Sequence, residues 1–206
     1  TDELLKLFKK NGLGNASSLT CTLSPALPFA VLSPEKTHST HVQKVNGRVV
    51  YEGVATATRQ ALANGIPVGL GTDSACPFVT HYDMWREVVY FQRHTGVTPE
   101  FALHTATLKN AQLLGVANET GSIETGKSAD LIVLDANPLD DLCALRNVEQ
   151  VYMAGKPVKY KAKHLPKIDA ELDGIMNGLD NDPFVSEWNI ASEKKSLNPF
   201  AKRGTK

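Results

Sequence analysis

The chain has 206 residues, a formal net charge of zero (22 Lys and Arg against 22 Asp and Glu) and 42% hydrophobic residues. This is the composition of a soluble globular protein, and its charge balance argues against nucleic acid or an anionic membrane surface as a partner. No apolar run approaches the about 20 residues of a membrane-spanning helix. Three widely spaced cysteines and the lack of a secretory signal favour a reducing, cytoplasmic location.

The first 115 residues alternate predicted helices with two short strands, which indicates an α/β fold. The predicted helices cover residues 1–10, 54–64, 82–94 and 98–115. The strands are expected over Ser18–Leu23 and Ile66–Asp73, and the second is an unalternating apolar run, typical of a parallel sheet buried on both faces. The proline-rich segment Ser24–His41 is too long for a simple connector, so we expect a functional loop there.

After Gly115 the sequence changes to short β segments and turns. Strands are expected over residues 130–134, 148–153 and 156–158, with a hairpin turn at Ala154-Gly155. From Lys161 the chain is polar, with one amphipathic helix whose apolar face carries Ile168, Leu172, Ile175, Met176 and Leu179. The remainder, to Lys206, is expected to dock on a partner surface or stay mobile.

Asp73 is the strongest candidate for a chemical role. It lies where a buried strand ends, and in α/β barrels the polar groups at the carboxyl ends of strands face the active site. A carboxylate there can bind a metal ion and take a proton from metal-bound water. Spacing alone leaves an alternative open, in which Asp73 caps the following turn.

Several motifs in fixed order resemble the closing part of the amidohydrolase superfamily, in the branch with imidazolonepropionase and prolidase-like metallopeptidases. They are Gly71-Thr72-Asp73-Ser74, residues 98–103 (TPEFAL), 106–111 (ATLKNA), 121–135 (GSIETGKSADLIVLD), 137–141 (NPLDD) and 151–156 (VYMAGK). The resemblance covers about residues 45–160 well and the first 44 loosely.

That resemblance implies an α/β fold built as the C-terminal part of a TIM (β/α)8 barrel plus strands of a small β-sandwich domain. Residues 1–115 would supply the last barrel strands and helices, residues 116–160 part of the sandwich, and residues 161–206 a polar extension. It also implies one or two divalent metal ions, usually zinc, with Asp73 as both metal ligand and general base. The implied reaction is metal-dependent hydrolysis of an amide, peptide or cyclic amide bond in a small-molecule substrate.

The other metal ligands of the family have no match in this chain, which has no His-x-His pair. If the two predicted strands are barrel strands seven and eight, those ligands belong before Thr1. One carboxylate cannot hold a catalytic zinc, which normally takes three protein ligands. We therefore expect the chain to be the C-terminal half of a larger enzyme, completed by the missing N-terminal half or by a second copy. A non-catalytic fragment or partner subunit is the alternative, because an open barrel leaves unpaired strand edges.

Three histidines are candidates for substrate contact. His38 and His41 lie on the proline-rich loop, and His81 lies in the loop after the second strand, eight residues beyond Asp73. Each has a structural alternative: the first two as exposed loop residues, and His81 as a partly exposed residue at a helix entry. Residues 121–128 match the spacing of a phosphate-binding loop, but a strand rather than a helix follows, which excludes a nucleotide site.

Overall fold

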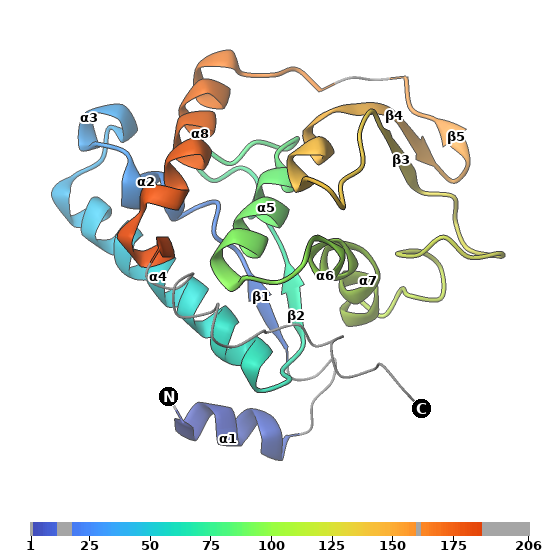
Figure 1. Cartoon of the computed structure of the whole chain (residues 1–206), viewed down its shortest axis with the longest axis horizontal. Coiled ribbons are helices and arrows are strands. Elements are labelled where there is room, and N and C mark those ends of the chain that lie inside the picture. Colours follow the sequence, from blue (N-terminus) through green and yellow to red (C-terminus); the bar gives the residue numbers. More distant parts are fainter. Residues whose placement is uncertain (1, 12–17, 160–161, 187–206) are drawn as a thin grey trace.

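The computed structural model describes residues 2–11, 18–159 and 162–186, and Figure 1 shows their arrangement. The helices, in chain order, are α1 (Asp2–Lys10), α2 (Leu27–Val31), α3 (Pro34–Thr37), α4 (His41–Ala63), α5 (Met84–Thr95), α6 (Pro99–His104), α7 (Asn110–Leu113) and α8 (Pro166–Gly178). The strands are β1 (Leu19–Cys21), β2 (Val68–Leu70), β3 (Leu131–Leu134), β4 (Val148–Met153) and β5 (Lys156–Pro157). The mixed α/β class is therefore as predicted.

Strands β1 and β2 form a parallel pair at the centre of the molecule, with Leu19 opposite Val68 and Cys21 opposite Leu70. Parallel strands need a long crossover connection, which α2, α3 and α4 provide here. All three residues of β2 are buried, as its unalternating apolar sequence predicts. Both strands are shorter than the predicted ranges, because only three residues of each have ladder partners.

The proline-rich segment, which we expected to be a functional loop, is largely helical. It forms the two short helices α2 and α3, each with a proline in its first turn, where the missing N–H costs nothing. Helix α4 then begins at His41 instead of Val54, with a capping box between Thr40 and Gln43. Valines and a glycine in its first half weaken helix propensity and hid this longer helix.

The helix predicted over residues 98–115 is confirmed and contains one irregular turn. Thr98 caps α6 by accepting the Phe101 N–H at 3.3 Å. A π-helical turn over Thr105–Lys109 separates α6 from α7. Such turns widen the helix locally and often occur at functional sites; here the turn directly precedes Asn110, whose side chain reaches β2.

The predicted β segments after Gly115 form a separate antiparallel sheet in the order β3-β4-β5. Ala154 (φ 49°) and Gly155 (φ 75°) form the β4–β5 hairpin turn, and two successive left-handed residues are what a tight hairpin turn requires. A 3-10 turn over Leu142–Arg146 joins β3 to β4 and packs beside α5.

The amphipathic helix predicted after Lys161 is α8, continued by a 3-10 turn over Leu179–Asn181. Its apolar residues Leu172, Ile175, Met176 and Leu179 are buried in the main core, so this part of the extension packs against the body. Arg48 bonds Asp182 through both terminal nitrogens (2.8 and 3.2 Å), which ties the end of the extension to α4. The predicted arm from residue 187 lies outside the described residues.

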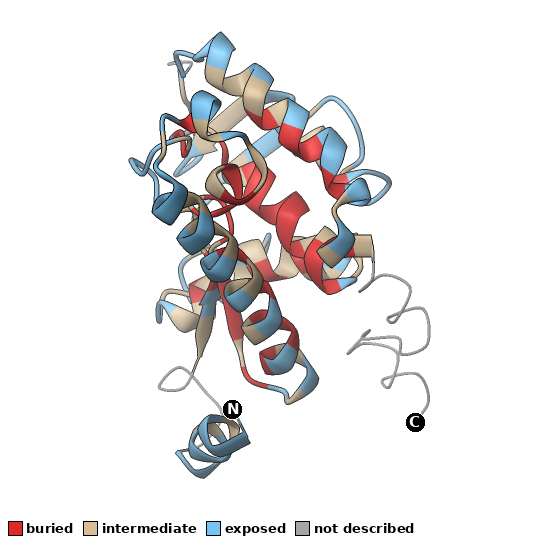
Figure 2. Cartoon of the chain, turned by 90° about the vertical axis from the view of Figure 1, so that its left-hand side faces the viewer, coloured by how far each residue is buried: buried red, intermediate tan, exposed pale blue. Residues whose placement is uncertain are grey.

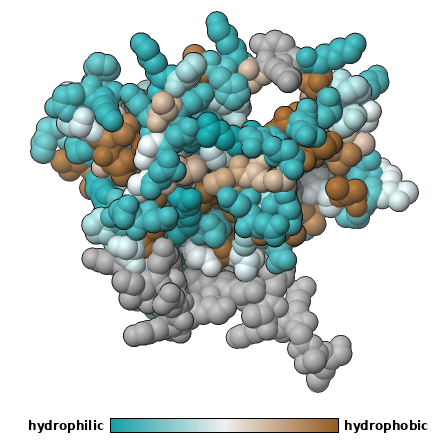
Figure 3. Space-filling model, turned by 45° about the horizontal axis from the view of Figure 1, so that its top comes forward, coloured by the Kyte–Doolittle hydropathy of each residue, from teal (hydrophilic) through white to brown (hydrophobic). Residues whose placement is uncertain are grey.

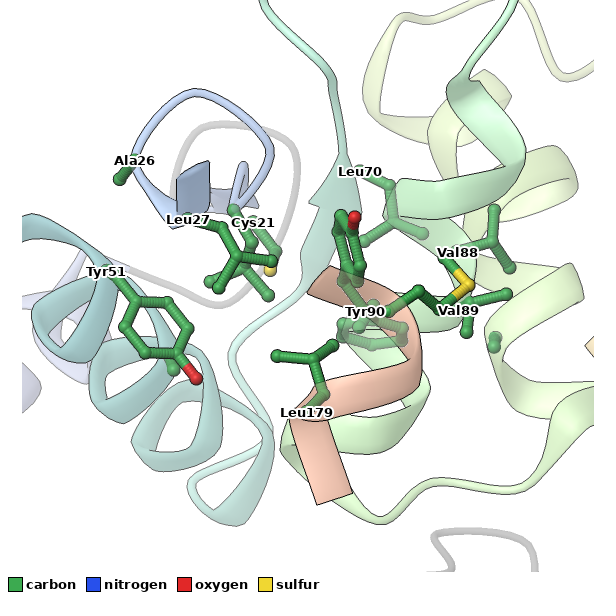
Figure 4. Close-up of a cluster of buried hydrophobic side chains, with 14 of the residues drawn as sticks. Cys21, Ala26, Leu27, Tyr51, Leu70, Val88, Val89, Tyr90 and Leu179 are labelled. Carbon is green, nitrogen blue, oxygen red and sulfur yellow. The ribbon is translucent and has the colours of Figure 1, made fainter. Parts of the chain in front are cut away.

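One core joins these elements, and α5 is its most buried helix, with nine of twelve residues buried (Figure 2). Figure 4 shows the cluster, in which Leu27 from α2, Tyr51 from α4, Leu70 from β2 and Leu179 from the extension gather with Val88, Val89 and Tyr90 of α5. Among the described helices, none has both the length and the apolarity that crossing a membrane requires.

Candidate active site

The two parallel strands end at the same edge of the molecule, and both continue into loops there. The Gly71 N–H donates to the Cys21 carbonyl (3.1 Å), which extends the ladder one residue past β2. A Cβ at Gly71 would lie 3.3 Å from the Thr20 methyl group, so glycine permits this close approach. Asp73 follows two residues later, at the carboxyl end of β2 where sequence reasoning places it.

A side-chain amide closes the outer edge of β2 just before this end. Asn110 donates from Nδ2 to the Leu70 carbonyl and accepts the Leu70 N–H at Oδ1, both at 2.9 Å. At Leu70, these two bonds take the place of the hydrogen bonds that a neighbouring strand would make with β2. Gly69 makes the contact possible, because a Cβ there would lie 2.8 Å from the Asn110 Oδ1. Sequence reasoning included Asn110 only as a motif position and gave it no role.

The backbone after Asp73 is a tight and strained turn. The Cys76 N–H donates to the Asp73 carbonyl (3.2 Å), and the Ala75 N–H donates to the Val79 carbonyl (3.3 Å). Asp73 (φ 51°), Ala75 (φ 81°) and Phe78 (φ 65°) all have left-handed backbones although none is glycine. This conformation costs about 1–2 kcal/mol for an ordinary residue, and such strain concentrates at functional sites.

The Asp73 side chain is exposed at the beginning of this turn. Because the Asp73 carbonyl closes the turn, its carboxylate is not needed for capping, and no hydrogen bond to that carboxylate is found among the described residues. The Thr72 and Ser74 hydroxyls on either side bond each other at 3.0 Å. The carboxylate is therefore available to a cation, a water molecule or a substrate.

A buried glutamate that sequence reasoning missed anchors the other strand end. Glu87 of α5 is fully buried and accepts the Leu23 N–H (2.8 Å), the Ser24 N–H (2.9 Å) and the Ser24 hydroxyl (2.5 Å). Burial is the main cause that raises the pKa of Glu87 to about 7; the hydrogen bonds from Ser24 and Leu23 oppose this rise, and the negative charge of Asp73 contributes to it as the smallest cause. No local pattern marks Glu87, because its partners lie 63 and 64 residues away.

His81 is the predicted substrate-binding residue that lines a cavity in the structure. This cavity, of about 540 Å³, lies between the loop at Cys76–Tyr82 and the beginning of the extension at Ala162–Ile168. His38 and His41 do not line it. Both are exposed, His38 with a left-handed backbone (φ 51°) after α3 and His41 as the first residue of α4. Their roles in substrate contact stay predictions.

The described residues provide part of a metal-binding site but not a complete one. Asp73 is an accessible oxygen ligand, but within the described ranges no three His, Cys, Asp or Glu side chains are grouped so that they could hold a metal ion. A zinc site needs three or four protein ligands. The described residues therefore do not form a complete zinc site, and Asp73 could serve only as one of several ligands.

Comparisons with known proteins identify the family of the chain. The chain is 36% identical over 95 residues to imidazolonepropionase of Thermoplasma acidophilum, which covers 46% of the chain and 23% of that enzyme. It is 30% identical over 152 residues to imidazolonepropionase of Shouchella clausii, which covers 68% of the chain and 30% of that enzyme. The chain thus matches less than a third of the length of either relative.

A crystal structure assigned as a prolidase from Bifidobacterium longum is similar over 85% of this chain and 44% of its own, with 43% identity and a TM-score of 0.79. A crystal structure of a Xaa-Pro dipeptidase with bound methionine is similar over 77% of this chain and 37% of its own, with 27% identity and a TM-score of 0.60. The family model "Amidohydrolase family" matches residues 22–158. These likenesses imply an α/β fold of the TIM-barrel type, and the chain belongs to the amidohydrolase family.

Proposed function

We propose that the complete protein is a metal-dependent hydrolase of an amide, peptide or cyclic amide bond, with Asp73 as a metal ligand and general base. One observation carries the proposal: an exposed carboxylate stands at the carboxyl end of a buried parallel strand, on a strained turn that does not use it as a cap. Family membership adds the reaction class, since the similar proteins include imidazolonepropionases and a Xaa-Pro dipeptidase.

The Asp73 carboxylate would transfer the proton of the attacking water in this reaction. It would accept a proton from the attacking water and return it to the leaving nitrogen, which is the usual task of a general base in hydrolysis. A divalent ion, zinc in our proposal and one or two in number, would supply charge that stabilises the hydroxide and the developing oxyanion. Since no three possible ligands are grouped together among the described residues, Asp73 would need ligands from outside them.

The architecture that we propose for the complete protein comes from its family membership. Residues 1–115 would provide the last two strands and helices of a barrel, and residues 116–160 would provide part of a composite β-sandwich. Support comes from the parallel β1–β2 pair and the separate antiparallel β3–β4–β5 sheet. The barrel would be closed by an N-terminal half or by a second copy of the chain. A cytoplasmic location and a small-molecule amide or peptide substrate complete the proposal.

The test replaces Asp73 in the complete protein. With zinc present and a panel of cyclic amides and Xaa-Pro dipeptides as substrates, Asp73→Asn should lower kcat by about 100-fold or more, the usual contribution of a general base. Asp140→Asn, the same exchange at an exposed aspartate before the 3-10 turn, is the matched control and should keep wild-type turnover. Wild-type turnover in Asp73→Asn would refute the assigned role.

A non-catalytic partner subunit is the second candidate, favoured by the incomplete ligand set of the described residues. Metal analysis of the 206-residue chain, alone and mixed with the candidate N-terminal half, separates the two functions. If the protein is a hydrolase, we expect stoichiometric zinc and turnover in the mixture but not in the chain alone. If the chain is a non-catalytic partner subunit, we expect neither in either sample. Stoichiometric zinc in the chain alone would contradict our assignment of ligands from elsewhere.

A further inference from the structure

The beginning of the extension is fastened to the loop that carries Asp73. The Tyr82 hydroxyl accepts the Leu165 N–H (2.8 Å) and donates to the Asp169 carboxylate (3.1 Å). The His164 ring lies against the Tyr82 ring, with centroids 4.2 Å apart. Residues 162–168, which we call the strap, are therefore held against this loop by one of its tyrosines.

The cavity under the strap is lined by residues of the loop that carries Asp73. Cys76 lines the cavity and its N–H bonds the Asp73 carbonyl. Residues joined by this bond are the ends of a four-residue turn, whose Cα atoms lie within about 7 Å. The cavity thus begins one turn away from the exposed carboxylate. His81, on the same loop, lines it as well.

The lining of the cavity is mainly apolar. Its apolar walls come from Pro77, Phe78 and Val79 on the loop and from Ala162, Leu165 and Ile168 on the strap, and its polar groups are Thr80, His81, Tyr82 and Lys163. Figure 3 looks onto this end of the molecule and shows hydrophobic residues among hydrophilic ones. The volume of about 540 Å³ is typical of a small-molecule site. Leu165 is 45% exposed, so part of this apolar surface still meets water and is available to a ligand.

We propose that the strap and the Asp73 loop together form a specificity pocket that binds an apolar side chain of the amide substrate. The inference rests on the proposed function only for the statement that the ligand is an amide. Burying an aliphatic side chain in such a pocket strengthens binding with each carbon, by roughly fourfold per methylene. The extension after residue 161 would then select substrates as well as cover the core.

Binding of blocked amino acids to the 206-residue chain tests this proposal without turnover. The probes are the N-acetyl amides of glycine, alanine, leucine and phenylalanine, titrated while the methyl signals of Val79, Ala162, Leu165 and Ile168 are followed by NMR. We expect the Kd to fall along the series, with the leucine amide binding roughly tenfold or more tighter than the glycine amide. The shifts should be largest at these methyl groups.

Leu165→Asp should remove this dependence on side-chain size because it places a carboxylate in the pocket. Leu139→Asp is the matched control, since Leu139 is 47% exposed and lies outside the cavity, and it should preserve the dependence. Equal affinities for all four probes in the wild-type chain, or shifts confined to other surfaces, would overturn the pocket. Failure of the hydrolase proposal would appear instead as full turnover in Asp73→Asn, a measurement that these titrations do not use.

Discussion

Helix α5 carries two fully buried titratable groups whose effects on stability have opposite signs. Burial raises the pKa of Glu87 to about 7 from its ordinary value of 4.5. Burial lowers the pKa of His94 to about 4 from 6.5. The His94 Nδ1–H donates to the Tyr90 carbonyl (2.6 Å), and its Nε2 accepts the Tyr51 hydroxyl (2.7 Å), an arrangement that uses the neutral ring.

The sign of each effect follows from which state binds more protons. Between pH 4.5 and about 7 the folded chain keeps the Glu87 proton that the unfolded chain has lost, so this group makes stability fall as pH rises. Between about pH 4 and 6.5 the unfolded chain binds a proton at His94 that the folded chain excludes, so this group makes stability rise with pH. At about 1.36 kcal/mol per pKa unit, each effect amounts to about 3 kcal/mol over its full range.

The two slopes therefore nearly cancel between pH 4.5 and 6.5 in the wild-type chain. Glu87→Gln should remove the falling slope and leave the rising slope of His94. The free energy of unfolding of this variant should therefore increase by about 3 kcal/mol from pH 4.5 to pH 6.5. His94→Gln should show the opposite, a loss of about 3 kcal/mol from pH 4.5 to 7. The acids whose pKa is lowered, such as Asp173 and Asp130, titrate below this window.

Urea unfolding followed by fluorescence at half-unit pH intervals measures these profiles, and the comparison uses each variant's change with pH. Glu100→Gln, at an exposed glutamate on α6, is the matched control and should follow the wild-type profile. A Glu87→Gln profile parallel to wild type from pH 4.5 to 7 would show that the buried carboxyl has no raised pKa. It would also remove the electrostatic link that we draw between Glu87 and Asp73.

Two further substitutions test the contacts that hold the site. Asn110→Ala should lower the free energy of unfolding by about 2 kcal/mol, because the Leu70 N–H and carbonyl lose both partners; exposed Asn118→Ala is the control, and a loss below about 0.5 kcal/mol would contradict the role. Asp173→Ala should cost about 2–3 kcal/mol, because the buried Arg86 loses its 2.8 Å partner. Exposed Asp180→Ala should have little effect, and equal unfolding midpoints for these two variants would refute the assignment.

The sequence predicted what depends on local patterns. The position of Asp73 at the end of a buried strand is predictable because eight consecutive residues carry the pattern, while its chemical role stays a prediction. The turn at Ala154-Gly155 and helix α8 were found because hairpin chemistry and helical periodicity are also local. The long helix α4 was only half found, since tertiary packing outweighs the weak propensity of its valine-rich beginning.

The contacts that shape the candidate site could not be predicted in this way. Glu87 bonds Ser24, Asn110 bonds Leu70 and Tyr82 bonds Leu165 across 63, 40 and 83 residues. A glutamate or an asparagine usually faces solvent, and a tyrosine is intermediate in burial, so residue type alone gives no sign of these roles. Such contacts become apparent only when the fold brings distant segments together.

These long-range contacts change the meaning of the extension after residue 161. Asp173 of α8 bonds both Arg86 of α5 (2.8 Å) and Arg146 of the 3-10 turn (3.0 Å). One carboxylate therefore joins the extension to α5 and to the segment between β3 and β4. Arg86 directly precedes Glu87, which anchors the end of β1. A substitution at Asp173 that moves Arg86 should therefore also displace Glu87, the next residue of α5, and with it the end of β1. Removing residues 162–186 should for this reason disturb the Asp73 loop as well as the core.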